Sequence, residues 1–161
     1  MKDLNELMVQ MSNLNKKDFR DKMTDLTFKM AQLENAAVRE TYAENASIDT
    51  YNGNDLEHFF GEGTYIRKIT MNKGSIIMSV IHTVLHPFFV LKGKATVLSE
   101  DGLINIEAPY FGMTKPGTQR LLVIHEDMEW YTVHPTEKTD IEEICNDVTS
   151  KDYNHPKLKI T

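Results

Sequence analysis

The sequence predicts a mainly β protein with a helical N-terminus, built as one β-sandwich or barrel. Three observations predict this fold class. The length of 161 residues is that of a single domain. Near residue 48, helix-like hydrophobic spacing gives way to short alternating runs, and turn residues divide these runs at the intervals typical of β-sandwiches and barrels. We therefore expect two helices over residues 1–47 and a β-barrel with a C-terminal helix over residues 48–161.

The N-terminal segment carries two amphipathic helix patterns. In residues 2–14, apolar residues recur at intervals of three and four: Leu4, Leu7, Met8, Met11 and Leu14. A second helix is predicted after Asn15, a candidate N-cap. Its apolar seam has coiled-coil spacing: Phe19, Met23, Leu26, Met30, Leu33 and Ala37. This seam packs either on the chain's own domain or on a second copy of the chain, and the sequence leaves both alternatives open.

Eight short strands are predicted in the second half of the chain. They cover residues 64–71, 75–83, 86–91, 94–99, 103–108, 110–114, 119–124 and 129–134. The best hairpin signal between them is Asp101-Gly102, because both residues tolerate a positive φ. Lys92-Gly93-Lys94 and Glu126-Asp127 are also predicted to be turns.

Two further helices are predicted. Asn54 and Glu57 favour a short capped helix that contains His58, and the capping box Thr139-Asp140-Ile141-Glu142 begins a closing helix. Cys145 lies on the apolar face of that closing helix, so we interpret it as a core residue. As the only cysteine, it excludes an intramolecular disulfide and is typical of a reducing compartment.

The charge balance argues against two classes of partner. The chain has 18 basic and 24 acidic residues, a net charge of −6, which repels nucleic acid and anionic membranes. The first residues mix charges into their apolar run and match neither a signal peptide nor a membrane span. We expect a cytoplasmic protein.

The sequence has no P-loop, nucleophile elbow or Gly-rich dinucleotide turn. Phosphoryl transfer, α/β-hydrolase chemistry and classical nicotinamide binding therefore have no local support.

His82 and His86 are the strongest candidates for chemistry. On a regular strand, residues four apart lie on the same face, so both imidazoles would point inward. Imidazole binds Zn, Fe, Ni or Cu, but a metal centre needs three or more donors, and neighbouring strands would have to supply the others.

The spacing around this pair resembles the first motif of the cupin superfamily, G-x5-H-x-H-x3-E-x6-G. That motif is matched from Gly74 to Gly93, with Val80 at the first histidine, His82 at the second and His86 at the glutamate. The second cupin motif, G-x5-P-x-G-x2-H, is matched more loosely: Lys115-Pro116-Gly117 stands for its P-x-G turn, Arg120 is at the histidine position and Pro109 is at the leading glycine. The resemblance implies a jelly-roll barrel, the double-stranded β-helix, whose mouth holds a metal or a small ligand.

The departures from the motifs change what the resemblance implies. Val80 cannot bind a metal, and the permanent charge of Arg120 repels a dication. His82 and His86 remain as metal ligands for a divalent transition metal such as Zn, Fe, Ni or Mn, which Tyr65, His58 or His125 would have to complete. A metal centre and a metal-free cavity both stay open.

Arg120 suggests a second use for the same cavity. A guanidinium matches a carboxylate or phosphate, so Arg120 with the two histidines predicts a site for a small anionic ligand. Tyr65 and Arg67 share one face of the first strand and are candidates for the wall of this site. The alternative is that Arg120 forms an internal ion pair with a glutamate or lies on the surface.

The remaining strand histidines are interpreted structurally. His125 lies in a predicted hairpin tip, where polar residues are expected in any case. His134 precedes Pro135, and a local role at the end of its strand is favoured over ligation.

A narrower resemblance is to the small cupin-like proteins of tailed bacteriophages. The runs that carry it are His58-Phe59-Phe60, Gly63-Thr64-Tyr65, Lys115-Pro116-Gly117-Thr118, His125-Glu126-Asp127 and His134-Pro135-Thr136. It implies a phage-type, non-catalytic accessory protein that binds a small anionic ligand or a metal ion. The alternatives are a metal-dependent isomerase or dioxygenase and an assembly protein of the virion or host that uses the helical seam. A homo-oligomer, above all a dimer held through the helices or the barrel, is expected.

Overall fold

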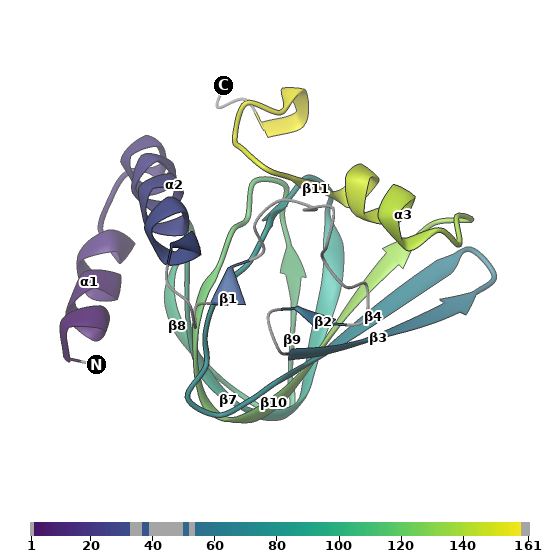
Figure 1. Cartoon of the computed structure of the whole chain (residues 1–161), viewed down its shortest axis with the longest axis horizontal. Coiled ribbons are helices and arrows are strands. Elements are labelled where there is room, and N and C mark those ends of the chain that lie inside the picture. The colour runs from purple at the N-terminus through teal and green to yellow at the C-terminus, as the bar shows by residue number, and fades with distance from the viewer. Residues whose placement is uncertain (1, 33–36, 39–49, 52–53, 159–161) are drawn as a thin grey trace.

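The fold is a curved β-sheet with helices on its outer face and at one end (Figure 1). This computed structural model describes residues 2–32, 37–38, 50–51 and 54–158. The helices are α1 (Lys2–Ser12), α2 (Lys16–Ala31), α3 (Ile141–Val148) and the 3-10 turn η1 (Pro156–Leu158). The strands are β1 (Ala37–Val38), β2 (Thr50–Tyr51), β3 (Asn54–Gly61), β4 (Thr64–Met71), β5 (Ile76–Met78), β6 (Ile81–His82), β7 (His86–Ser99), β8 (Gly102–Glu107), β9 (Tyr110–Thr114), β10 (Leu121–Pro135) and β11 (Thr149–Ser150).

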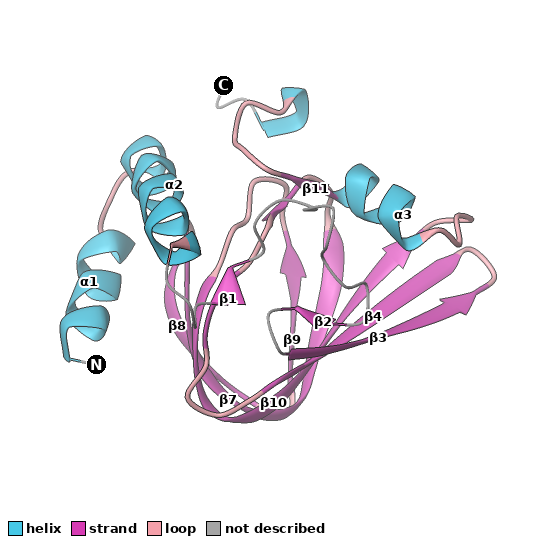
Figure 2. Cartoon of the chain, in the orientation of Figure 1, coloured by secondary structure: helices cyan, strands magenta, loops and turns pink. Residues whose placement is uncertain are grey.

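Two long antiparallel strands, β7 and β10, belong to both halves of the sheet. The first part of β10 pairs with β5 and with the end of β7, while its last part pairs with β4 and with the start of β7. The start of β7 also pairs with β9, and its end pairs with β8. Because both strands bend midway, the two half-sheets fold toward each other, as the curved magenta strands of Figure 2 show. Among the described strands the sheet does not close into a barrel.

The bend coincides with a β-bulge at which the strand register shifts three times. Gly93 lies there with φ of +94°, and a Cβ at this position would be 2.5 Å from the carbonyl oxygen of Asp127. Only glycine allows the two backbones to approach this closely. Lys92-Gly93-Lys94 and Glu126-Asp127, predicted to be turns, are therefore the bent middles of two continuous strands. The predictions of separate strands over 86–91 and 94–99, and over 119–124 and 129–134, were wrong.

The main core fills the space between the half-sheets. It contains Leu56, Met71, Ile77, Phe88, Val90, Ala95, Val97, Ile106, Leu122, Ile124, Met128 and Trp130. The alternating pattern along the strands places these residues on one face, as the sequence predicts. The strand register shows this directly, because it brings Leu122 opposite both Ile77 and Val97.

A second core lies between the helices and the outer face of one half-sheet. It contains Met8, Met11, Phe19, Met23, Met30, Met78, Leu98, Leu121 and Val123. The helical seam thus packs on the chain's own sheet, the first of the two predicted alternatives. Residues Leu121 to Ile124 are all buried because helices cover one face of this strand and the main core covers the other.

Other sequence predictions need correction. The second helix ends at Ala31 rather than Ala37, which belongs to β1, and Leu33 lies outside the described residues. Residues 54–61, in which a short helix was predicted around His58, form β3 and pair with β4. The predicted strand 75–83 is divided into β5 and β6. The predicted boundary at residues 47/48 also lies outside the described residues. None of the described helices combines the length and apolar character needed to cross a lipid bilayer.

Candidate functional site

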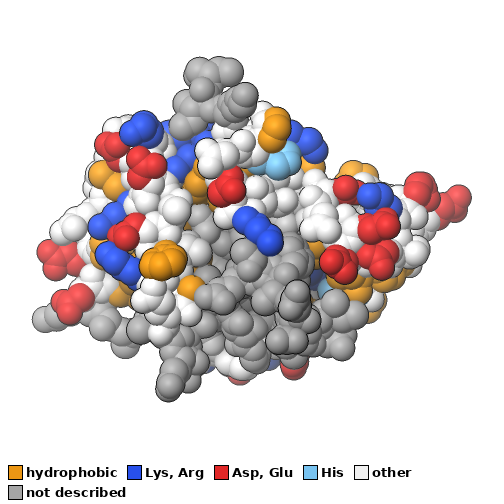
Figure 3. Space-filling model, turned by 45° about the horizontal axis from the view of Figure 1, so that its top comes forward, with side chains coloured by type: hydrophobic (Ala, Val, Ile, Leu, Met, Phe, Trp, Pro, Cys, Tyr) orange, Lys and Arg blue, Asp and Glu red, His pale blue; other side chains and the backbone are white. Residues whose placement is uncertain are grey.

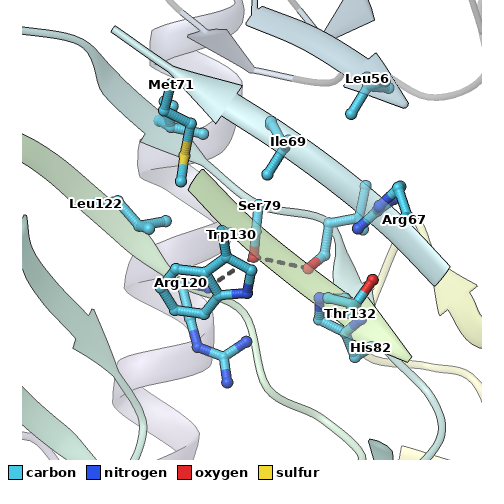
Figure 4. Close-up of a pocket in the computed structure, with 12 residues that line it drawn as sticks. Leu56, Arg67, Ile69, Met71, Ser79, His82, Arg120, Leu122, Trp130 and Thr132 are labelled. Carbon is cyan, nitrogen blue, oxygen red and sulfur yellow. Dashed lines mark hydrogen bonds between the residues drawn. The ribbon is translucent and has the colours of Figure 1, made fainter. Parts of the chain in front are cut away.

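A cavity of about 70 Å³ opens between the two half-sheets. The described residues that line it are Leu56, Arg67, Ile69, Met71, Ile77, Ser79, Val80, His82, Arg120, Leu122, Trp130 and Thr132 (Figure 4). The sequence predicted three of them, Arg67, His82 and Arg120, as site residues. These residues come from segments far apart in the chain, and the folding of one half-sheet onto the other brings them together.

Arg120 enters the cavity from the segment that precedes β10. Its backbone N–H donates to Ser79 Oγ at 2.9 Å, and its carbonyl accepts from the Ser79 N–H at 2.8 Å. Its guanidinium donates to Thr114 Oγ1 at 3.0 Å and stacks over Phe88 and Trp130, with its central carbon 5.0 and 5.5 Å from the ring centroids. Backbone and side chain are therefore both held in place.

Within the described residues no carboxylate forms an ion pair with the Arg120 guanidinium, which is only 9% exposed, although the charge of Asp101 acts on it and favours the charged form. Burial lowers the pKa of Arg120 to about 10, so the side chain stays charged at neutral pH. An unpaired charge in a buried site is costly. The predicted alternative of an internal ion pair to a glutamate is not seen in the described part of the chain.

Arg67 brings a second guanidinium to the same cavity. It lies on β4, where its register partners are Thr132 on β10 and His58 on β3. Within the described residues no ion pair or hydrogen bond holds its side chain. Thr132 is 5% exposed, and its Oγ1 is buried without a hydrogen-bond partner. The Arg67 end of the cavity therefore holds a guanidinium and a hydroxyl with unused hydrogen-bonding capacity, and Arg120 adds a second guanidinium to the lining.

His82, His86 and His134 form a cluster of buried imidazoles beside this end. The ring centroids of His82 and His86 are 4.8 Å apart, and those of His86 and His134 are 4.2 Å apart. His86 Nδ1 lies 3.1 Å from the Val84 carbonyl, which fixes the N–H on Nδ1 and leaves Nε2 with a lone pair. His82 Nδ1, His86 Nε2 and His134 Nδ1 are buried, and none has a hydrogen-bond partner among the described residues. The pair predicted from sequence is thus joined by a third histidine.

Electrostatics keep these imidazoles neutral. Burial lowers the pKa of His86 to about 4 and that of His134 to about 3. The pKa of His82 is held well below its usual range, chiefly by burial and then by His86 and Arg120. Positive guanidinium groups nearby act in the same direction as burial. The histidines therefore contribute neutral donors and acceptors rather than charge.

The arrangement does not fit the metal centre that the cupin resemblance implies. Within the described residues, no group of three or more His, Cys, Asp or Glu side chains is placed to hold a metal ion. Val80 lines the cavity at the position of a missing ligand, and Arg120 supplies a positive charge. His125, considered as a further ligand, is exposed on the bent part of β10 rather than at a hairpin tip, and its Nε2 lies 2.8 Å from Thr96 Oγ1.

Tyr65 lies beyond the cavity, behind the histidine cluster. Its ring centroid is 6.0 Å from that of His134, and its hydroxyl is 2.8 Å from His58 Nδ1. Tyr65 and Arg67 do share a face of β4, as predicted, but only Arg67 is among the described residues that line the cavity.

Sequence reasoning missed Thr132 and His134 as site residues and assigned Trp130 to the core alone. A signal for all three was present, because residues 130, 132 and 134 share one face of a strand. Pairing that strand with β4 places them opposite Ile69, Arg67 and Tyr65. Because Pro135 follows His134, the sequence favoured a local role for this histidine at the end of its strand.

Gln119, next to Arg120, points to the opposite side of the chain and joins three segments. Its Nε2 donates to Thr27 Oγ1 on α2 at 3.2 Å and to the Ser79 carbonyl at 3.1 Å. Its Oε1 accepts from the Tyr153 hydroxyl at 3.0 Å. The residue is 4% exposed, so the cavity wall is tied to α2 and to the C-terminal segment through buried bonds.

Comparisons with known proteins give similarity in structure only. No protein-family model matches the sequence, and no curated protein sequence matches it. The chain is similar to a cupin-2 domain protein from Shewanella frigidimarina (11% identity, 51% of this chain and 80% of that one, TM-score 0.42). It is also similar to a predicted oxalate decarboxylase from Thermotoga maritima (12% identity, 52% of this chain and 81% of that one, TM-score 0.43). A third similar structure is the plu4264 protein from Photorhabdus luminescens (14% identity, 68% of this chain and 92% of that one, TM-score 0.47). All three TM-scores lie below 0.5, so the fold described above rests on this chain's own strand pairing, and membership of the cupin superfamily stays a prediction.

Proposed function

We propose that this chain is a cupin-like, phage-type accessory protein with a jelly-roll fold that binds a small anionic ligand in the cavity between Arg67 and Arg120, without catalysis. The observation that carries the proposal is the pair of guanidinium groups on one cavity whose described lining contains no carboxylate. The exterior differs in sign: the chain carries a net charge of −6, and acidic side chains gather over α3 and the β3–β4 hairpin in Figure 3. A cationic cavity inside an acidic protein is selective for small anions that can enter it.

The described lining supports binding rather than catalysis. It contains no carboxylate, and its one serine is already engaged, because Ser79 Oγ donates to the Val80 carbonyl at 2.9 Å and accepts from the Arg120 N–H. No activated nucleophile and base pair is therefore present among these residues. A metal-dependent isomerase or dioxygenase, the main alternative, is favoured only by the three close imidazoles, and the missing ligand set argues against it.

The assembly hypothesis is less favoured. Of the helical seam, Phe19, Met23 and Met30 are each at most 7% exposed in the single chain, as are Met8 and Met11 on α1. A partner would have to displace the sheet to reach them. Formation of a homo-oligomer stays a prediction that light scattering tests directly.

Replacing Arg120 by methionine tests the proposed function. We expect anion affinity, followed through the fluorescence of Trp130, the only tryptophan, to fall about tenfold or more, because a charge-assisted bond contributes about 1.5–3 kcal/mol. Without ligand, we expect the same variant to be as stable as the wild type or more stable, because an unpaired buried charge gives way to an apolar chain of similar length.

The matched control is Lys92→Met, which removes one positive charge from an exposed residue outside the described cavity lining. We expect it to leave anion affinity unchanged. Equal affinity of the Arg120→Met variant and the wild type for phosphate and for acetate would overturn the proposal. A large loss of stability without ligand would also overturn it, because it would show that Thr114, Phe88 and Trp130 already compensate the buried charge.

A further inference from the structure

The cavity is polar at one end and apolar at the other. Along β4, the residues that face it run from Arg67 through Ile69 to Met71, and their partners on β10 run from Thr132 to Trp130 and Met128. Leu56 pairs with Ile69 and extends the apolar end onto β3. In Figure 4, Ile69 lies between Met71 and Arg67 along β4, with Leu122 on the side of Met71 and with His82 and Thr132 on the side of Arg67.

The size of the cavity limits its occupant. A volume of 70 Å³ holds about five water-sized groups. Sites for sugars, nucleotides and other drug-sized molecules are several times larger, about 300–1,000 Å³. The occupant therefore has about five or six non-hydrogen atoms, which allows one acidic group and a short chain.

The polar end supplies donors in excess. Arg67 and Arg120 donate only, and the Thr132 hydroxyl has no partner. A planar carboxylate accepts from two guanidinium groups along its edges. A tetrahedral phosphate or sulfate, or a second carboxylate, would instead place charged oxygens against Ile69, Met71 or Leu122 without hydrogen bonds, which is costly.

We propose that the ligand is the anion of a short-chain aliphatic monocarboxylic acid of about four carbons, with its carboxylate between Arg67 and Arg120 and its alkyl chain toward Met71. This inference rests on the proposed function, because it requires that the cavity binds an anion. It adds the chemical class and the orientation: charge at the Arg67 end, methyl at the Met71 end.

A homologous series of ligands tests the inference. Trp130 fluorescence of the full chain is titrated with acetate, propionate, butyrate, pentanoate, hexanoate and octanoate, and with phosphate and succinate. We expect affinity to rise about fourfold for each methylene up to about four or five carbons, because each buried methylene contributes about 0.8 kcal/mol. We expect octanoate, phosphate and succinate to bind more weakly than butyrate.

A variant at the apolar end tests the orientation. Met71→Ala lengthens the cavity, so we expect the preferred chain to become longer by about two carbons, while acetate affinity changes little. Met23→Ala is the matched control, because it removes the same side chain from the helix-side core and should keep the wild-type preference. If Met71→Ala does not fold, Ile69→Val makes the same test with a smaller change, and the series on the wild type already decides the ligand class.

The two proposals fail in different ways. Binding of phosphate or succinate as tightly as butyrate, with no dependence on chain length but with sensitivity to Arg120→Met, would overturn the short-chain acid and leave the anion site in place. Absence of binding by every anion in the series would overturn both.

Discussion

At the scale of single residues, the three buried histidines have the environment that differs most from water. His82, His86 and His134 are each at most 4% exposed, and the guanidinium groups of Arg67 and Arg120 face the same region. Both burial and positive charge oppose protonation. Each histidine therefore folds as a neutral ring, while in the unfolded chain it takes up a proton below about pH 6.5.

This difference predicts acid sensitivity. The folded-state pKa values of His86 and His134, about 4 and about 3, lie below the unfolded value of 6.5, so the unfolded state binds more protons in the interval between them. The stability is complete above pH 6.5 and falls as the pH drops from there. We expect a loss of about 1.4 kcal/mol for each pH unit and each histidine, measured by urea unfolding at a series of pH values.

Removing one buried histidine tests whether these side chains cause the acid sensitivity. We expect His134→Asn to make the fall of the unfolding free energy with pH shallower by about one proton. If the variant keeps the wild-type slope, His134 is not one of the groups that couple folding to pH.

How well the site can be predicted from sequence also depends on single residues. His82, His86 and Arg120 were found because motif spacing within one segment fixes them. Arg67 followed from alternation on one strand. Thr132 and His134 join them only through the pairing of β10 with β4, which depends on register and not on nearby sequence. The absence of a carboxylate beside Arg120 is a property of packing that no local pattern encodes.

At the scale of elements, the bent strands show where local patterns become ambiguous. A glycine between two apolar runs is expected both in a turn and in a bulge, and both need a positive φ. Gly93 and Gly102 look alike in sequence, yet Gly102 lies at the predicted hairpin while Gly93 lies within β7. The hairpin turn is at Glu100-Asp101 rather than at Asp101-Gly102, because Gly102 already pairs with Ser99 as the first residue of β8. The alternation of the strands could be predicted, but their continuity through the bend could not.

The close approach at the bend predicts a large effect of a small substitution. We expect Gly93→Ala to lower the free energy of unfolding by about 3 kcal/mol or more, through strain at positive φ together with the clash against the Asp127 backbone. Gly74→Ala separates the two causes, because Gly74 also has a positive φ, +86°, but nothing lies within 4 Å of its added Cβ. That variant should lose only about 1 kcal/mol. Equal losses in urea unfolding would show that the bend tolerates a side chain.

At the scale of the whole molecule, the start of β10 is a shared wall: the helices pack on one face of residues 121–124 and the main core packs on the other. An ion pair strengthens this contact: Arg20 Nε on α2 donates to Glu100 Oε2 at 2.8 Å, with both side chains less than 10% exposed. Arg20 also donates to the Leu158 carbonyl at 2.9 Å, which ties the C-terminal segment to the same helix.

This shared wall predicts the behaviour of a truncated chain. A protein that starts at Ser47 would expose Met78, Leu98, Leu121 and Val123 and would leave Glu100 unpaired. We expect it to aggregate, because soluble monomers rarely expose such apolar patches. Light scattering and circular dichroism measure the outcome, with the exposed substitution Phe28→Ser in the full chain as a control. A truncated chain that stays monodisperse with a native sheet would show that the sheet folds independently of the helices.

The adjacency of Gln119 and Arg120 has a consequence for recognition. Gln119 is anchored to α2 and to the C-terminal segment, and Arg120 carries charge into the cavity. The guanidinium is therefore oriented when the protein folds, before a ligand binds. The Arg120 side chain then loses little rotational freedom when a ligand binds. Pre-organisation of this kind favours rapid, lock-and-key capture over induced fit.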